Sequence, residues 1–193
     1  INEGDGAFYG PKIDIMMKDA LKRQWQMGTI QLDFQLPRNF DITYTDSDGT
    51  EKTPVLIHRV IYGSLERFIG IIIENFKGAF PFWISPVQVG IVPIGDKHVE
   101  YAKEIENELR NVRVRCESEL SDNHMNKKIK YFRNYRVPYI LVVGDNEMDN
   151  KTVAVNIRGG KQMKDIPLDA FISLCDRLNK TRALELVDDS ENV

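Results

Sequence analysis

The sequence predicts an α+β part followed by an α/β part. Residues 1–83 hold strand patterns typical of an antiparallel sheet and end in one long apolar helix. Residues 84–193 alternate apolar strands with amphipathic helices, which predicts a mixed sheet with helices on its faces. A chain of 193 residues is long enough for two small domains. We place the boundary near Trp83, within a segment rich in proline and aromatic residues.

The strands of the first part are expected at 13–16, 29–36, 41–45 and 55–58, and the last two flank the turn residues 46–50 as a hairpin. The segment 29–36 alternates strictly, so one face is polar and the other apolar. The polar face would carry Thr29, Gln31, Asp33 and Gln35. Such a face is either the wet side of an antiparallel strand or the floor of a pocket for a polar ligand.

A helix is expected at 60–76, where apolar residues occur nearly all round, and we expect it to be buried behind the sheet. Gly63, Arg67 and Gly70 would share one face of this helix. The simplest explanation for glycines on this face is close packing of another backbone, and it accounts for Gly70. For Gly63 and Arg67 together we prefer a ligand, because a guanidinium stacks on a flat base and pairs with phosphate oxygens.

The second part begins with an apolar strand and ends with an amphipathic helix. Strands are expected at 87–93, 112–116, 139–143 and 152–157, and helices at 97–111, 126–135 and 168–182. Alternating elements of this kind bring the strands into one mostly parallel sheet. The acidic end from Asp188 is expected to fray.

Composition narrows the class of protein. The net charge of −3 argues against a protein that coats nucleic acid electrostatically, so any RNA contact must be local. No apolar run approaches the roughly 18 residues of a membrane span. The two cysteines, Cys116 and Cys175, have no CxxC partner and imply neither a disulfide framework nor a thiolate metal site. Since no secretory leader is recognisable, we expect a cytoplasmic fragment of a longer protein with no membrane partner.

Several motifs at matching spacing carry a specific resemblance. Gly63-Ser64-Leu65-Glu66-Arg67 resembles motif 3 of the class II aminoacyl-tRNA synthetases, a glycine-rich element that ends in Glu-Arg. It is accompanied by the segments 8–14, 25–34 and 57–59. Together these resemble the threonyl-tRNA synthetase family, and the resemblance continues to residue 182. It implies part of the antiparallel-sheet catalytic core in residues 1–83, followed by an anticodon-binding domain in residues 84–193.

The resemblance implies a ligase that joins threonine to tRNA(Thr) through a threonyl-adenylate made from ATP with Mg²⁺. Arg67 would contact ATP, Tyr9 the amino acid, and Lys12 the adenylate or the tRNA 3′ end. The adenosine site would also include Gln26, Thr29, Gln31, Gly63 and Ser64. Threonine carboxylate would attack the α-phosphorus of ATP, so catalysis would depend on positioning and electrostatics rather than on a side-chain nucleophile.

The resemblance also makes His58 one of three protein ligands of a Zn²⁺ that binds threonine. A lone histidine is more often structural than a ligand, and only the resemblance selects His58 over His98 or His124. An open coordination position would accept the threonine hydroxyl and reject valine. The other two zinc ligands, motifs 1 and 2 and the homodimer element would precede Ile1, so we expect the fragment by itself to be inactive.

Residues 87–182 resemble the anticodon-binding domain shared by several class II synthetases, most clearly at 137–144. By this resemblance Glu147 would read anticodon bases. A second reader would be Asn156 or, two residues later, Arg158. The basic side of the helix 126–135 is either a solvated face or an RNA-backbone contact, and it carries Lys127, Lys128, Lys130 and Arg133.

Two alternatives stay open. Another class II synthetase, prolyl or histidyl, would share the second domain but not the zinc-ligand histidine. A non-catalytic tRNA-binding subunit would keep the synthetase fold without the reaction. The complete motif around Arg67 argues against a loss of catalytic activity.

Overall fold

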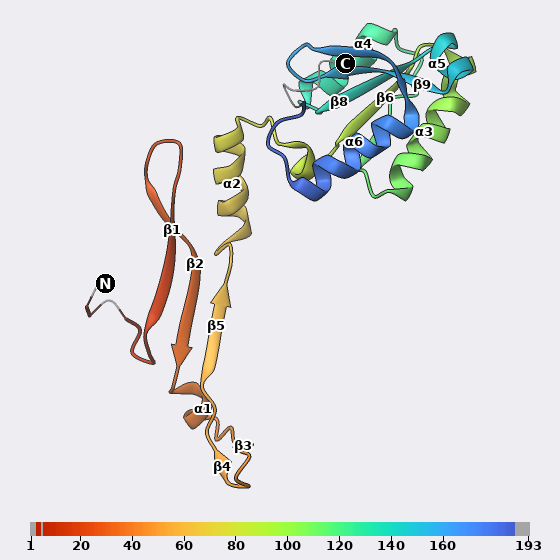
Figure 1. The fold of residues 1–193 in the computed structure, drawn as a ribbon. Helices are drawn as coiled ribbons and strands as arrows, with labels where there is room; N and C mark the ends of the chain where they lie inside the picture. Colours follow the sequence, from red (N-terminus) through yellow and green to blue (C-terminus); the bar gives the residue numbers. More distant parts are fainter. Residues whose placement is uncertain (1–2, 5, 188–193) are drawn as a thin grey trace. The chain divides into compact units, whose positions relative to one another are not determined.

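A computed structural model describes residues 3, 4 and 6–187, and the acidic segment from Asp188 lies outside them. The chain folds as two compact units, one ending at Lys77 and one beginning at Gly78 (Figure 1). The short helix η1 (Phe82–Ile84) belongs with the second unit, because Phe82 is completely buried in that unit's core. The packing therefore changes several residues before the boundary expected at Trp83.

The first unit contains a three-stranded antiparallel sheet of order β1-β2-β5. Its strands are β1 (Lys12–Lys18), β2 (Gln24–Asp33) and β5 (Leu56–Val60). The short strands β3 (Tyr44–Thr45) and β4 (Glu51–Lys52) form a separate hairpin. The antiparallel sheet predicted for this part is confirmed. The expected hairpin between 41–45 and 55–58 is wrong, because β3 pairs with β4 and β5 pairs with β2.

Strand β2 is shorter than expected at its end. Asp33 accepts hydrogen bonds from the backbone N–H groups of Gln35 and Leu36 at 2.8 and 2.9 Å, and the chain turns there into α1 (Leu36–Asn39). Gln35 is the N-cap of α1 rather than a strand residue. Its expected place on the polar strand face is therefore wrong.

A bulge changes the alternation along β2. Ile15 on β1 pairs with Gly28, but Met16 pairs with Gln26, so Met27 has no partner in this register. One extra residue on one strand shifts the phase of all residues beyond it. Gln26 therefore falls on the same face as Thr29.

Helix α2 (Leu65–Phe76) begins five residues later than expected, because β5 continues to Val60 and Ser64 is the N-cap. Within this helix only Ile71 is buried, and Ile69 is 49% exposed. The apolar face of the sheet is also open, with Ile13 and Ile57 64% and 65% exposed. The expected burial of the helix behind the sheet is wrong for the described chain.

The second unit contains a five-stranded mixed sheet of order β10-β9-β8-β6-β7. Strands β6 (Val89–Pro93), β7 (Cys116–Ser118) and β8 (Tyr139–Val143) are parallel, and β9 (Thr152–Ile157) and β10 (Gln162–Pro167) join antiparallel. The mixed α/β sheet predicted for this part is confirmed. The helices are η2 (Asp96–His98), α3 (Val99–Asn111), α4 (Met125–Asn134), α5 (Asp145–Asn150) and α6 (Leu168–Thr181).

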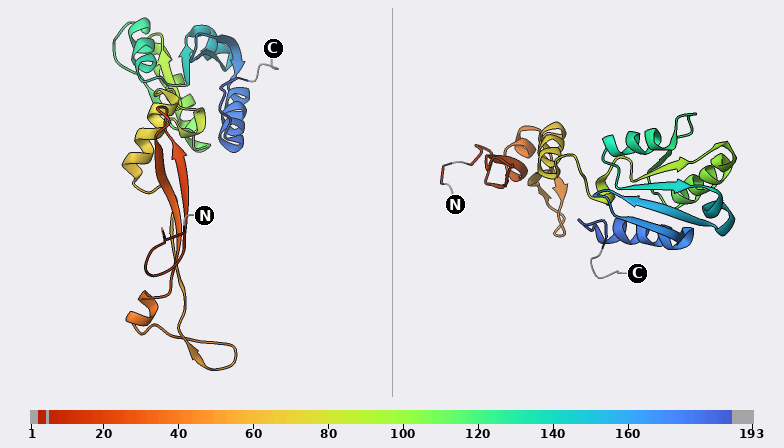
Figure 2. Two further views of the ribbon diagram at one scale, coloured as in Figure 1. Left: turned by 90° about the vertical axis from the view of Figure 1, so that its left-hand side faces the viewer. Right: turned by 90° about the horizontal axis from the view of Figure 1, so that it is seen from above.

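Helices cover both faces of this sheet (Figure 2). Tyr139 and Leu141 of β8 belong to the large core that also contains buried side chains of α3 and α6. Ile140 belongs instead to a smaller core with Phe132 of α4. Burial on both faces explains why β6 and β8 are apolar throughout. No helix among the described residues is long and apolar enough to cross a membrane.

Candidate functional site

Three polar side chains lie in one row across the sheet of the first unit. In the register Lys12 pairs with Gln31, and Gln31 pairs with His58 on the other side. The loop before β1 adds Tyr9, whose hydroxyl donates to Oε1 of Gln31 at 2.6 Å. The rings of Tyr9 and His58 meet edge to face, with centroids 6.2 Å apart. The sheet thus brings together four residues that the sequence assigned to the amino-acid, adenosine and zinc sites.

His58 is held by a buried carboxylate. Its Nε2 lies 2.8 Å from Oδ2 of Asp33, whose side chain is 1% exposed. Burial by itself raises the pKa of Asp33, but the hydrogen bonds from His58, Leu36 and Gln35 outweigh it, so the pKa lies below its ordinary value. An ionised carboxylate only accepts, so Nε2 is the nitrogen that donates to Asp33, and Nδ1 takes no part in this contact.

Asp14 is a hub that the sequence did not single out. Its carboxylate receives Lys12 Nζ at 2.9 Å, Thr29 Oγ1 at 2.9 Å and Gln26 Nε2 at 2.5 Å. The hydrogen bond from Lys12, followed by that from Thr29, lowers the pKa of Asp14. Its position in the segment 8–14, on the same strand face as Lys12, was the available signal. Three predicted site residues therefore meet on one carboxylate.

Arg67 lies on an aromatic platform. Its guanidinium carbon is 5.2 Å from the centroid of Trp25, and that of Arg23 is 5.7 Å away. Trp25 is fixed because Nε1 donates to Asp19 at 2.9 Å, and this bond is the main reason why the pKa of Asp19 falls to about 2. Trp25 was not among the site residues expected from the sequence. It keeps Arg67 at the start of α2 by a cation–π contact.

Gly63 and Ser64 shape the entry to α2. Gly63 precedes the helix, has a φ of +64°, and a Cβ added there would lie 3.0 Å from the carbonyl oxygen of Met27 in the bulge. Around Gly70, by contrast, there is open space. Close backbone packing therefore explains Gly63 and not Gly70, which reverses the sequence interpretation. The Ser64 hydroxyl accepts from the Arg67 N–H at 3.4 Å and donates to Glu66 at 2.6 Å.

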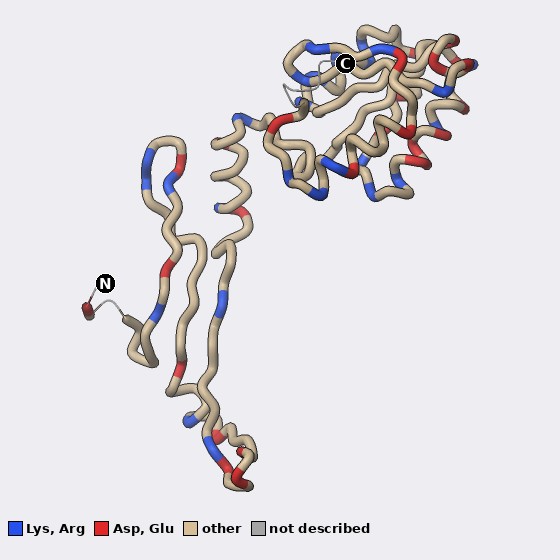
Figure 3. Tube along the Cα trace, in the orientation of Figure 1, with Lys and Arg blue, Asp and Glu red and all other residues tan. Residues whose placement is uncertain are grey.

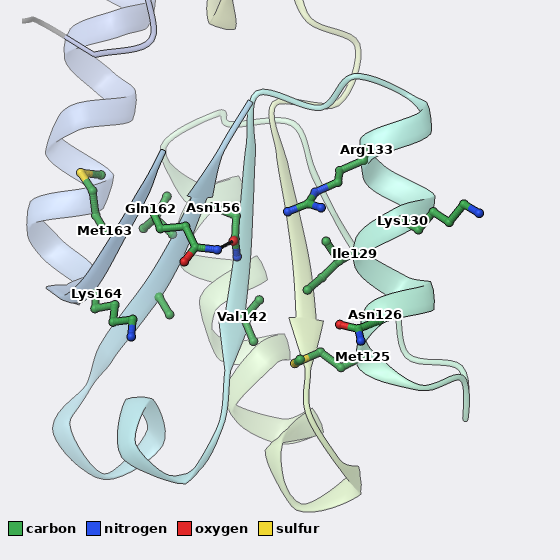
Figure 4. A pocket seen from close by; sticks show the side chains of 12 residues that line it. Met125, Asn126, Ile129, Lys130, Arg133, Val142, Asn156, Gln162, Met163 and Lys164 are labelled. Carbon is green, nitrogen blue, oxygen red and sulfur yellow. Dashed lines mark hydrogen bonds between the residues drawn. The ribbon is translucent and has the colours of Figure 1, made fainter. Parts of the chain in front are cut away.

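A groove of about 530 Å³ lies in the second unit between α4 and the strands β8, β9 and β10 (Figure 4). Apolar and amide side chains form its floor, and three cations border it. The lining comprises Met125, Asn126, Ile129, Lys130, Arg133, Val142, Ala154, Val155, Asn156, Gln162, Met163 and Lys164. It contains no carboxylate among these residues. Along the chain as a whole, acidic and basic residues are interspersed (Figure 3).

The amide of Asn156 stands in this groove, paired with a neighbour. Gln162 Nε2 donates to Asn156 Oδ1 at 2.6 Å across β9 and β10. Arg133 and Asn156 also line an adjoining hollow of about 600 Å³. They therefore mark the place where the two hollows meet.

Arg158 and Glu147 have local partners. The guanidinium of Arg158 donates to the carbonyl oxygens of Arg136 and Phe80, both at 2.8 Å, and its burial lowers its pKa. It lies after β9, at the wall of the adjoining hollow. Glu147 Oε2 accepts from the Gly144 N–H at 2.9 Å in the first turn of α5. Glu147 is outside the lining of both hollows.

The basic side of α4 is not uniformly solvated. Lys128 is 6% exposed, and its Nζ donates to the Pro93 carbonyl at 3.3 Å. Lys128 is therefore a structural residue. The exposed cations of this helix are Lys127, Lys130 and Arg133.

Family models match both units. Residues 1–76 match the model described as "tRNA synthetase class II core domain (G, H, P, S and T)". Residues 88–178 match the model described as "Anticodon binding domain". The two matches agree with the division of the chain into an antiparallel and a mixed-sheet unit.

Curated relatives are threonine–tRNA ligases. The Campylobacter jejuni subsp. doylei ligase is 52% identical over 174 residues, which cover 90% of this chain and 29% of the relative. The Acetivibrio thermocellus ligase is 47% identical over 192 residues, which cover 100% of this chain and 29% of the relative. The chain thus spans less than a third of the length of the relatives it matches.

Solved structures give the same result. The RNA-binding domain of threonyl-tRNA synthetase from Cryptosporidium parvum Iowa II has a TM-score of 0.79 and 45% identity, covering 91% of this chain and 44% of that one. A prolyl-tRNA synthetase from C. parvum shares the fold, with a TM-score of 0.68 and 22% identity over 93% of this chain and 39% of that one. The chain therefore belongs to the class II aminoacyl-tRNA synthetases, in the threonine–tRNA ligase family, and combines part of the core domain with an anticodon-binding domain.

Proposed function

We propose that the chain is part of an enzyme that charges tRNA(Thr) with threonine through a threonyl-adenylate. The observation that carries the proposal is the row of Lys12, Gln31 and His58 across three strands, with the Tyr9 hydroxyl bonded to Gln31. Amides, a phenol, a cation and an imidazole on one sheet face suit a small amino acid joined to a nucleotide.

The polar contacts support separate roles for two groups of residues, one at the amino acid and one at the adenylate. Tyr9 and His58 lie together and are suited to the amino acid. Gln26 and Thr29 share Asp14 with Lys12, which keeps three hydrogen-bonding groups in fixed positions near the adenylate. Preorganised donors of this kind stabilise charge that develops during acyl and phosphoryl transfer. Mg²⁺ is proposed to accompany ATP.

Arg67 is proposed to bind ATP at the nucleotide site, with Gly63 and Ser64 setting its position. Ser64 caps the helix that carries Arg67, and Gly63 lets the preceding backbone approach the bulge at Met27. The donors of a guanidinium match phosphate oxygens, and its flat face matches a base. When a nucleotide is bound, Arg67 would therefore exchange its contact with Trp25 for contacts to the ligand.

We propose that His58 is one ligand of a Zn²⁺. Among the described residues no group of three potential metal ligands is present, so His58 would act with ligands from elsewhere in the enzyme. His58 fits this role, because Asp33 holds Nε2 and leaves Nδ1 as the donor atom. The metal would supply an open position that recognises the amino and hydroxyl groups of threonine.

The second unit is proposed to bind the anticodon of the tRNA. The groove beside α4 joins cations to an apolar floor with amides, which suits phosphates around an unstacked base. We place Asn156 in this contact rather than Arg158, whose donors already serve two carbonyl oxygens. Glu147 would reach a base from the neighbouring turn through its second carboxylate oxygen. The complete enzyme is proposed to be a cytoplasmic homodimer.

A chimera tests the assignment. The segment of the A. thermocellus ligase that aligns with all of this chain would be replaced by the chain, and threonine-dependent ATP–pyrophosphate exchange would be measured. We expect exchange in the chimera, at least about 100-fold less for Arg67→Ala, and an unchanged rate for the exposed control Arg110→Ala. The 193-residue chain by itself should give no exchange. Exchange supported by proline or histidine instead of threonine would sink the proposal.

A further inference from the structure

The groove of the second unit contains an arginine that has no side-chain partner among the described residues. Arg133 projects from α4 over the groove toward Asn156 (Figure 4). Among the described residues no hydrogen bond or ion pair engages its guanidinium, and none of the lining residues is acidic. Five donors in a fixed plane are therefore presented to whatever enters.

The surroundings of Arg133 suit a base better than a phosphate. Ile129 and Val142 offer apolar surface beneath it, where a planar ring can lie. Asn156, whose amide is fixed by Gln162, stands at the far side of the same hollow. A phosphate gains nothing from an apolar floor, whereas a base edge needs directed donors above such a surface.

Lys130 provides the contrast on the same helix. It lies three residues before Arg133, yet its ammonium points away from Asn156 (Figure 4). An exposed, flexible ammonium at the rim suits the RNA backbone. The two neighbouring cations thus face different parts of a bound RNA.

We propose that Arg133 is a specificity-determining residue that reads the O6 and N7 acceptors of a guanine in the anticodon. This rests on the proposed binding of tRNA(Thr) by the second unit. Paired acceptors on one edge distinguish guanine from adenine, which has an amino group in place of O6, and an arginine fork matches them with two parallel donors. Threonine codons begin with AC, so every threonine anticodon carries guanine at its centre.

Neither β9 nor the residue that follows it offers an available guanidinium for a base, whereas Arg133 on α4 does. Asn156 has no positive charge, and Arg158 is anchored to the carbonyl oxygens of Arg136 and Phe80. The arginine that remains available at the junction of the two hollows is Arg133. Base reading is therefore assigned to α4 together with β9, and not to the strand alone.

The test is binding of the 193-residue chain to the anticodon stem–loop of tRNA(Thr) with guanine, inosine or 2-aminopurine at the centre. Inosine keeps O6 and N7, whereas 2-aminopurine lacks O6. We expect inosine to bind about as well as guanine and 2-aminopurine to bind about 10-fold to 100-fold more weakly. Arg133→Ala should remove this difference, and Arg133→Lys should restore general affinity but little of the difference.

Lys130→Ala is the matched control, and it should weaken binding of all three stem–loops by the same factor. An equal loss for all three with Arg133→Ala would overturn the assignment of Arg133 and leave RNA binding by this unit intact. Absence of binding to any stem–loop by the folded chain would overturn the anticodon-binding proposal, and the reading of guanine with it. Arg133 is exposed, so its substitution does not threaten the core.

Discussion

Nε2 of His98 lies 3.0 Å from Oδ1 of Asp145, and this bond joins η2 to the first turn of α5 in the second unit. The other ring nitrogen, Nδ1, accepts from the N–H of Gly95 at 3.1 Å. His98 is 3% exposed. One buried imidazole therefore fixes the loops that follow two neighbouring parallel strands, β6 and β8.

We expect His98→Ala to lower the free energy of unfolding of the second unit by about 1–3 kcal/mol, because it removes both hydrogen bonds of a buried imidazole and leaves a cavity in its place. Lys97→Ala is the control. It removes an exposed ion pair to the same Asp145, worth about 1 kcal/mol or less. Urea denaturation followed by circular dichroism measures both changes. Equal effects of the two substitutions would show that the imidazole bridge contributes nothing specific.

Two glycines should respond in opposite directions to alanine. A Cβ at Gly90 would lie 2.5 Å from the Phe132 ring, inside the core beneath α4, so Gly90→Ala should destabilise by about 1–3 kcal/mol. Gly70 lies within α2 and faces open space. Gly70→Ala should stabilise the helix by about 0.5–1 kcal/mol. Thermal unfolding compares the two, and a stabilising Gly90→Ala would contradict the packing described.

The first unit should lose stability in acid through Asp19. Its pKa in the folded chain is about 2, below the ordinary value of 3.8 for an aspartate. A carboxylate with a depressed pKa contributes stability above the unfolded value, and this contribution is lost as the pH falls from about 4 to 2. Denaturation at pH 5 and pH 2.5 should show the loss, and Asp19→Asn should reduce its dependence on pH. An unchanged pH dependence in Asp19→Asn would argue against the Trp25 and Arg23 contacts as its source.

If His58 binds Zn²⁺ as proposed, Asp33 should govern how tightly the metal is held in the complete enzyme. Asp33→Asn keeps the size of the side chain but offers a weaker acceptor to Nε2, so we expect zinc to be lost to a chelator at about 10-fold to 100-fold lower chelator concentration. The chimera described above would be titrated, with zinc release followed by a metal-sensitive dye. Asp48→Asn, in the exposed turn between β3 and β4, is the control. Equal zinc release from both variants would show that Asp33 has no effect on zinc affinity.

Arg158 should behave as a structural residue. Arg158→Ala removes the hydrogen bonds to the carbonyl oxygens of Arg136 and Phe80 and should cost about 1–3 kcal/mol of unfolding free energy. Any loss of RNA affinity should then be independent of the anticodon sequence, as for Lys127→Ala. A sequence-dependent loss would return base reading to Arg158.

The sequence was sufficient for the elements that packing or periodicity determines. Apolar strands such as Tyr139–Val143 are buried on both faces, so the mixed sheet of the second unit could be predicted. The resemblance selected Lys12, Gln31, His58 and Arg67 one by one. The row that Lys12, Gln31 and His58 form across three strands was not predicted and follows from the register of the strands.

What could not be predicted depends on contacts between distant segments. In the sequence Lys128 cannot be distinguished from Lys127, because both are lysines in the same basic helix. Only the hydrogen bond to the Pro93 carbonyl shows that Lys128 is structural. The helix at Leu65 was placed too early because β5 pairs with β2 up to Val60. Asp14 became visible as a hub only once β1 and β2 were set in register.

The bulge at Met27 makes the first unit sensitive to chain length rather than to side-chain identity. Removing this single residue would make β2 a regular strand, in which Gln26 would lie two residues from Thr29 and stay on the same face of the sheet. It would also withdraw the carbonyl oxygen that the loop at Gly63 approaches. A substitution of Met27 would keep this carbonyl oxygen in place, whereas a deletion of Met27 would disturb the entry to α2 and leave the Asp14 cluster on one face of the sheet.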